Sequence, residues 1–93
     1  MTELRRQVLP GIAFGMHEVV LYTRAGCSLC ETAKEQILAV RARVAFGFRE
    51  VDIASNDELF EEHRYDIPVV EVDGQRAFKH RVDPAVLLRR VSA

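Results

Sequence analysis

The stretch EVVLYTRAGCSLC, residues 18–30, contains the two features from which the fold and the chemistry are predicted. Its first part, Glu18 to Tyr22, is short, rich in apolar and β-branched residues, and followed by a turn-forming segment, as expected of a buried strand. Its last part holds Cys27 and Cys30, the only two cysteines of the chain. The segment therefore predicts a strand that leads through a turn into a helix, with the cysteine pair where the helix begins.

The position of the cysteine pair predicts a reactive dithiol. A thiol at the N-terminus of a helix lies beside unpartnered backbone N–H groups and the positive end of the helix dipole. Both favour the thiolate, which is the nucleophile in thiol–disulfide exchange. Cys30 follows Cys27 by three positions, which places it on the same side of a helix and within reach of a disulfide. We expect Cys27 to be the attacking thiol and Cys30, one turn further inward, to be the resolving thiol.

Length and composition indicate one small globular domain. The chain has 93 residues, of which 48% are hydrophobic and 29% charged, both ordinary values for a globular protein. Its net charge of −1 offers no basic field that would favour nucleic acid as a partner. No apolar run approaches the roughly 20 residues that a membrane helix needs. We therefore expect neither nucleic acid nor a membrane as a partner, and we expect a monomer.

The chain is predicted to consist of an N-terminal extension, residues 1–17, and one domain, residues 18–93. The apolar part of the extension is interrupted by Pro10-Gly11, and Glu3 lies where a signal peptide would be basic. We therefore expect no signal peptide and a cytoplasmic location, where two cysteines are not expected to form a permanent disulfide. The extension has no clear hydrophobic period. Two interpretations therefore stay open: a flexible segment, and an apolar patch folded onto the domain.

Three helices are predicted from hydrophobic spacing and from capping residues. Apolar residues recur every three or four positions over residues 30–44, which indicates an amphipathic helix. Ser55 and Glu58 match the pattern of a capping box at the start of a short helix. Asp83 can cap a third helix with Pro84 at its first position. The expected helices run from 28 to 44, from 55 to about 65, and from 84 onward.

The strands and their order predict the fold class. Residues 46–53 alternate in part between apolar and polar, which predicts a second strand, and residues 67–72 are predicted as a third. Asp73-Gly74 predicts a type I′ hairpin turn, because both turn positions need a positive φ, so residues 75–78 return antiparallel. The order is β-α-β-α-β-β-α, and its first helical crossover joins parallel strands. The expected fold is α/β, with a four-stranded mixed sheet and helices on both faces.

This order, with a cysteine pair at the start of the first helix, resembles the thioredoxin fold, and most closely its glutaredoxin-like branch. Residues 20–30 resemble the opening of glutaredoxin-like proteins, with Arg24 at the basic position three before the first cysteine. Ile67-Pro68 resembles the family's hydrophobic–proline pair, in which the proline is cis and faces the active site. The resemblance covers about residues 18–92 and is greatest to the small glutaredoxin-like proteins of bacteria. It implies a thioredoxin-like fold and a thiol–disulfide oxidoreductase.

Two departures from the glutaredoxin pattern bear on glutathione. Ser28 and Leu29 stand between the cysteines, where glutaredoxins usually carry proline and an aromatic residue. Phe78-Lys79 stands where the family usually carries a Gly-Gly pair followed by the acidic residues that hold glutathione. The cationic side chains of Lys79 and Arg81 attract carboxylates without the family's geometry, so we expect glutathione to bind only weakly.

The substrate-binding residues are predicted to surround the cysteine pair. Arg24 could lower the pKa of the Cys27 thiol as a nearby cation, or it could be an ordinary solvated turn residue. Leu29 is expected to be partly exposed at the rim of the site, where it could touch a protein substrate. The backbone of Ile67, next to a cis Pro68, is expected to pair with an extended substrate.

The leading interpretation is a thiol–disulfide oxidoreductase that acts through Cys27 and Cys30 on a disulfide-containing protein or a small thiol. No organic cofactor or metal is required for this chemistry. The rival interpretation is a thioredoxin-like binding module whose cysteines are structural or bind metal. A structural zinc site needs four ligands, and no histidine lies at ligand spacing from the pair. His80 is the histidine expected to be closest to the dithiol.

Overall fold

The computed structural model describes residues 17–92, which contain a four-stranded mixed sheet and three α-helices. The predicted N-terminal extension lies outside the described residues, except for His17. The strands are β2 (Glu18–Thr23), β3 (Gly47–Asp52), β4 (Val69–Val72) and β5 (Gln75–Lys79), and the helices are α1 (Ser28–Arg41), the 3₁₀ turn η1 (Ile53–Ser55), α2 (Asp57–His63) and α3 (Pro84–Val91).

The sheet has the order β3-β2-β4-β5. β2 pairs in parallel with β3, as expected of two strands joined through α1. β4 is antiparallel to β2, and β5 is antiparallel to β4 with an irregularity between Val70 and Glu71. The predicted α/β class and mixed four-stranded sheet are confirmed.

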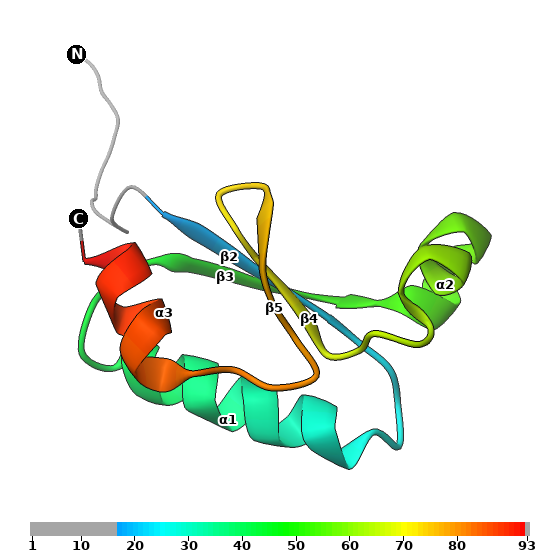
Figure 1. The fold of residues 1–93 in the computed structure, drawn as a ribbon, viewed down its shortest axis with the longest axis horizontal. Coiled ribbons are helices and arrows are strands. Elements are labelled where there is room, and N and C mark those ends of the chain that lie inside the picture. Colours follow the sequence, from blue (N-terminus) through cyan, green and yellow to red (C-terminus); the bar gives the residue numbers. More distant parts are fainter. Residues whose placement is uncertain (1–16, 93) are drawn as a thin grey trace.

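Alternation along the strands divides the sheet into two differently covered faces. Val19 and Leu21 of β2 have no exposed surface and belong to the main core with Ile37 of α1 and Leu87 of α3. Figure 1 shows α1 and α3 along this face and α2 at the end of the sheet that β2 reaches. Tyr22 points to the opposite face, where its ring stacks on a ring of α2 at a centroid distance of 4.5 Å. Helices therefore cover both faces, but α2 covers its face only near Tyr22.

The predicted capping box at Ser55 is wrong. Residues 53–55 form the 3₁₀ turn η1, and the Ser55 hydroxyl donates to the carbonyl of Asp52 instead of capping a helix. Asn56 is the N-cap of α2, and its side-chain oxygen accepts from the backbone N–H of Leu59 at 3.0 Å. Serine and asparagine cap helices about equally well, so the extra turn decided between them.

Three predicted boundaries also move. The strand expected over 67–72 begins at Val69, since Pro68 has no N–H to contribute to a ladder. α1 ends at Arg41 rather than at 44, and the turn at residues 42–43 leads to Phe46, which has no exposed surface and lies in the core. The strand expected over 46–53 runs over Gly47–Asp52, because Ile53 already belongs to η1.

The predicted hairpin turn is confirmed by its backbone angles. Asp73 has φ 54° and Gly74 has φ 82°, the left-handed values that a type I′ turn requires. The Asp73 carboxylate also ties the turn to the start of β2. One of its oxygens accepts from the Glu18 N–H at 2.9 Å, and the other lies 2.6 Å from Nδ1 of His17. These hydrogen bonds, first that with His17, hold the pKa of Asp73 below its usual value.

We expect Asp73→Asn to lower the melting temperature by about 1–4 °C at neutral pH, because the exposed Asp73 carboxylate accepts hydrogen bonds from His17 and Glu18 and such exposed charged contacts contribute about 0.2–1 kcal/mol. Asparagine tolerates the left-handed turn, so the change isolates the charge. A carboxylate whose pKa is lowered by folding stabilises the native state above its unfolded pKa, and this contribution disappears as the pH falls through the folded pKa. Thermal unfolding should therefore differ between the two proteins at pH 7 and converge near pH 2. An equal difference at both values would contradict this role of the charge.

Candidate active site

Cys27 occupies the N-cap of α1, where the sequence placed it. Gly26, with φ 78°, turns the chain from the loop after β2 into the helix, a conformation that residues with a side chain rarely adopt. The Cys27 Sγ accepts a hydrogen bond from the Cys30 N–H at 3.2 Å. The two cysteines form a disulfide across a Cα–Cα distance of 5.2 Å. The predicted location of the pair and its ability to form a disulfide are confirmed.

The two sulfurs differ in access to solvent. Cys27 is half-buried at the start of the helix, whereas Cys30 is only 2% exposed. In the reduced protein, the Cys30 N–H and the positive end of the helix dipole would stabilise the Cys27 thiolate. Burial disfavours the thiolate of Cys30. This asymmetry supports an attacking role for Cys27 and a resolving role for Cys30.

Arg24 lies over an aromatic ring rather than standing free in its loop. Its Cζ is 5.3 Å from the centroid of the Phe60 ring, and the Cζ of Arg64 lies 4.9 Å from the same centroid. Cation–π contacts of this kind hold the guanidinium near α2. The sequence did not reveal Phe60 as the partner of Arg24. Assignment of Arg24 to substrate binding or to the pKa of Cys27 stays a prediction.

A pocket of about 570 Å³ opens beside Cys30, between α1 and the end of β3. Lys34 and Glu50 meet in it, with 3.1 Å between Nζ and Oε1. Glu50 faces α1 because its cross-strand neighbour Leu21 belongs to the core under that helix. A signal for this pair was present in the sequence: Glu50 continues the alternation of two apolar residues, Phe46 and Phe48, on the inward side of the strand.

A second, smaller hollow of about 80 Å³ lies between α1 and the connection from β5 to α3. Leu29 forms part of it and is 40% exposed, so its expected partial exposure is observed, while its contact with a substrate stays a prediction. His80 and Arg81 line the opposite wall. Phe78 packs against the core instead of facing the hollow. Strand alternation turns its side chain inward.

The Ile67–Pro68 bond is cis, as predicted. Tyr22 pairs with Val69, so the residue before Val69 lies beside the end of β2, from which the chain leads to Cys27. Pro68 is fully buried and Ile67 is half-buried. The Ile67 N–H already donates to the carbonyl of His63 at 3.2 Å. Strand-like pairing of this segment with a substrate would therefore have to use the Ile67 carbonyl.

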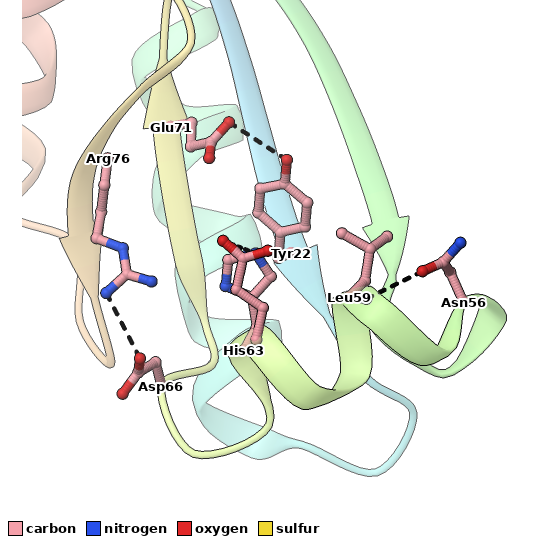
Figure 2. A network of polar contacts seen from close by, with 8 residues as sticks. Tyr22, Asn56, Leu59, His63, Asp66, Glu71 and Arg76 are labelled. Atoms are coloured by element: carbon pink, nitrogen blue, oxygen red, sulfur yellow. Dashed lines mark hydrogen bonds and ion pairs between the residues drawn. The ribbon is translucent and has the colours of Figure 1, made fainter.

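A polar network on the second face of the sheet supports α2 (Figure 2). The Tyr22 hydroxyl donates to Glu71 at 3.3 Å, and burial followed by this carboxylate raises the pKa of the phenol. His63 is 3% exposed and stacks on Tyr22. Arg76 lies 3.5 Å from a carboxylate oxygen of Asp66. Sequence reasoning did not predict this support.

The described residues also bear on the metal and membrane expectations. Within residues 17–92, no three histidine, cysteine, aspartate or glutamate side chains group together so as to hold a metal ion. None of the helices in that same part of the chain has the length and apolar character needed to span a membrane.

Comparison with known proteins assigns the family. Residues 18–92 match the glutaredoxin-like domain. The chain belongs to the glutaredoxin-like domain family. A glutaredoxin-like protein of Dictyostelium discoideum, the YDR286C homolog, is 41% identical over 68 residues, which cover 67% of this chain and 63% of that protein. This glutaredoxin-like domain thus spans less than two thirds of the length of that relative.

Solved structures confirm the thioredoxin fold of the glutaredoxin-like domain. The solution structure of protein Ne2328 from Nitrosomonas europaea matches with a TM-score of 0.71 at 22% identity, over 82% of this chain and 92% of that one. Thioredoxin from Fasciola hepatica matches with a TM-score of 0.59 at 19% identity, over 84% of this chain and 83% of that one. At these identities the similarity establishes the fold alone.

Proposed function

We propose that this glutaredoxin-like domain is a thiol–disulfide oxidoreductase that reduces disulfides through Cys27 and Cys30. The observation that carries the proposal is the position of Cys27 at the N-cap of α1, with its sulfur accepting the Cys30 N–H and bonded to the Cys30 sulfur. An inert pair of small apolar side chains needs neither the helix N-terminus nor the turn at Gly26 that leads to it.

The reaction proceeds in two exchanges. The Cys27 thiolate attacks one sulfur of the substrate disulfide, forms a mixed disulfide and releases the other substrate sulfur as a thiolate, which takes a proton from water. Cys30 then loses its proton to solvent, attacks the Cys27 sulfur and breaks the mixed disulfide, which releases the second substrate thiol. Two electrons pass to the substrate, and the Cys27–Cys30 disulfide remains. An external thiol donor reduces it again, without an organic cofactor or a metal.

The proposed substrate is a disulfide in a protein or small thiol that reaches the hollow beside Leu29. The exposed Leu29 side chain offers an apolar contact, and Arg81 offers a cation on the opposite wall. The carbonyl of Ile67 and the Pro68 segment lie on the side where β2 ends. Arg24 completes the proposed set of substrate contacts. We further propose that the protein acts as a monomer in the cytoplasm.

Single-turnover reduction of insulin disulfides by the reduced protein tests this function. One equivalent of protein should reduce about one disulfide and end with Cys27 bonded to Cys30, because each exchange cycle transfers two electrons. Thiol titration and metal analysis of the purified protein accompany the assay. Stoichiometric zinc or iron with two unreactive thiols would favour a binding module instead.

Glutathione is expected to bind this site with a dissociation constant weaker than about 1 mM. Arg81 and Lys79 attract its carboxylates, but this stretch lacks the Gly-Gly pair that would allow a close approach to the backbone. Attraction between exposed charges is screened by salt, so calorimetry at low and high ionic strength should show affinity that falls with salt. Efficient turnover at micromolar glutathione, unchanged in a Lys79→Gln/Arg81→Gln variant, would contradict this expectation.

A further inference from the structure

His80, in the connection between β5 and α3, has an unusual backbone conformation. Its φ is 68°, in the left-handed region that residues other than glycine rarely occupy. Its backbone N–H donates to the carbonyl of Pro68 at 2.7 Å. Its imidazole Nε2 lies 3.0 Å from the carbonyl oxygen of Tyr65. One residue of this connection therefore contacts both ends of the segment 65–68.

The contact between Nε2 of His80 and the carbonyl of Tyr65 determines which ring nitrogen carries hydrogen. A backbone carbonyl can only accept a hydrogen bond, so Nε2 of His80 must be the donor. The bond is consequently available to the imidazole in its Nε2–H form and in its protonated form. It is a contact between a side chain and the backbone of a segment fifteen residues earlier, which an asparagine at position 80 would be too short to reproduce.

The segment 65–68 is also held by contacts with the end of α2 and with β5. The carbonyl of His63, at the end of α2, accepts from the N–H groups of Asp66 at 2.9 Å and Ile67 at 3.2 Å. Arg76 of β5 reaches the Asp66 carboxylate at 3.5 Å, as Figure 2 shows. The contacts of His80 with Pro68 and Tyr65 join this segment to the hollow that His80 and Leu29 line.

We propose that His80 is a positioning residue that holds the Ile67–Pro68 segment in place for an extended substrate beside the dithiol. This inference rests on the proposed oxidoreductase function. His80 acts through the backbone of the segment and takes no part in the sulfur chemistry. Losing its imidazole contact should therefore weaken substrate binding and leave the reactivity of Cys27 unchanged, which appears as a change in KM rather than in kcat.

Two substitutions separate the contact from the backbone conformation. His80→Asn retains a residue that tolerates a left-handed φ but cannot reach Tyr65. His80→Gln is less suited to that φ but carries an N–H donor at about the reach of Nε2. We expect His80→Asn to raise KM for a protein disulfide about 10-fold, or about 1.4 kcal/mol, with kcat within about twofold of wild type. His80→Gln should restore most of the wild-type KM.

Amide hydrogen exchange of Ile67, followed by NMR, gives a readout independent of activity. Exchange at Ile67 should accelerate in His80→Asn and return toward wild type in His80→Gln, while alkylation of Cys27 keeps its pH profile in both. Unchanged KM or unchanged exchange in His80→Asn would overturn the proposal, as would equal behaviour of the two variants. A wild-type protein that reduces no disulfide would refute the oxidoreductase function, and the exchange rates would still report whether His80 holds the segment.

Discussion

Replacing Cys27 by serine should abolish disulfide reduction, whereas replacing Cys30 by serine should stop the reaction after the first exchange. The hydroxyl of serine is not ionised at neutral pH and cannot start the exchange, so Cys27→Ser should fall to the uncatalysed rate. Cys30→Ser keeps the attacking thiol at the helix N-cap but lacks the sulfur that resolves the mixed disulfide. Mass spectrometry should find the substrate covalently attached to Cys27 in this variant.

Alkylation of the reduced protein over a range of pH checks the chemical reason for this result. The rate should reach half its maximum below about pH 8.5, the ordinary pKa of a cysteine, because α1 presents its N–H groups to the Cys27 sulfur. The Cys30→Ser variant isolates the titration of Cys27 and serves as the control. A midpoint at or above the ordinary value, or trapped substrate on neither variant, would rule out the two-step mechanism.

Phe46→Ala should reduce the free energy of unfolding by about 3–5 kcal/mol, the usual cost of removing a buried aromatic side chain. Phe46 has no exposed surface and is among the largest fully buried side chains of the core. Its backbone is also fixed, because its carbonyl accepts from the Nε of Arg41 at 2.9 Å. Small domains are stable by only about 5–15 kcal/mol, so a large fraction of the total would be lost.

Leu38→Ala provides the matched control for urea unfolding. Leu38 is also a large apolar residue, but it lies on the outer side of α1 and is 40% exposed. Its replacement should change the free energy of unfolding by no more than about 0.5 kcal/mol, as is usual for surface positions. Similar losses in the two variants would show that Phe46 does not occupy a closely packed core.

Features that depend on a few neighbouring residues could be predicted from the sequence. Asp73-Gly74 indicated its turn because positive φ values at adjacent positions favour these residue types. Asp83 was expected to cap the last helix, and its carboxylate accepts from two N–H groups of the first turn. The cysteine pair belongs to the same category, since both the helix start and the reach of the disulfide follow from a spacing of three residues.

The N-cap of α2 could not be predicted, because two neighbouring residues were both suitable. Ser55 and Asn56 are both suitable N-caps, and the local pattern with Glu58 favoured the serine. The short turn η1 gave the position to the asparagine. That turn depends on where β3 ends and on the burial of Ile53, which has no exposed surface. Such burial depends on elements that are distant in the sequence.

The tertiary structure alone decided which distant side chains meet around the dithiol. Arg24 lies over Phe60, and Lys34 pairs with Glu50, although the two members of each pair lie far apart along the chain. The contact of His80 with the carbonyl of Tyr65 has the same origin. Hydrophobic spacing indicates which face of a helix or strand is buried. It does not indicate which side chain of another element packs against that face. The sequence by itself therefore determined the reactive pair and the order of the elements, and the packing of the sheet against its helices determined the surroundings in which that pair would act.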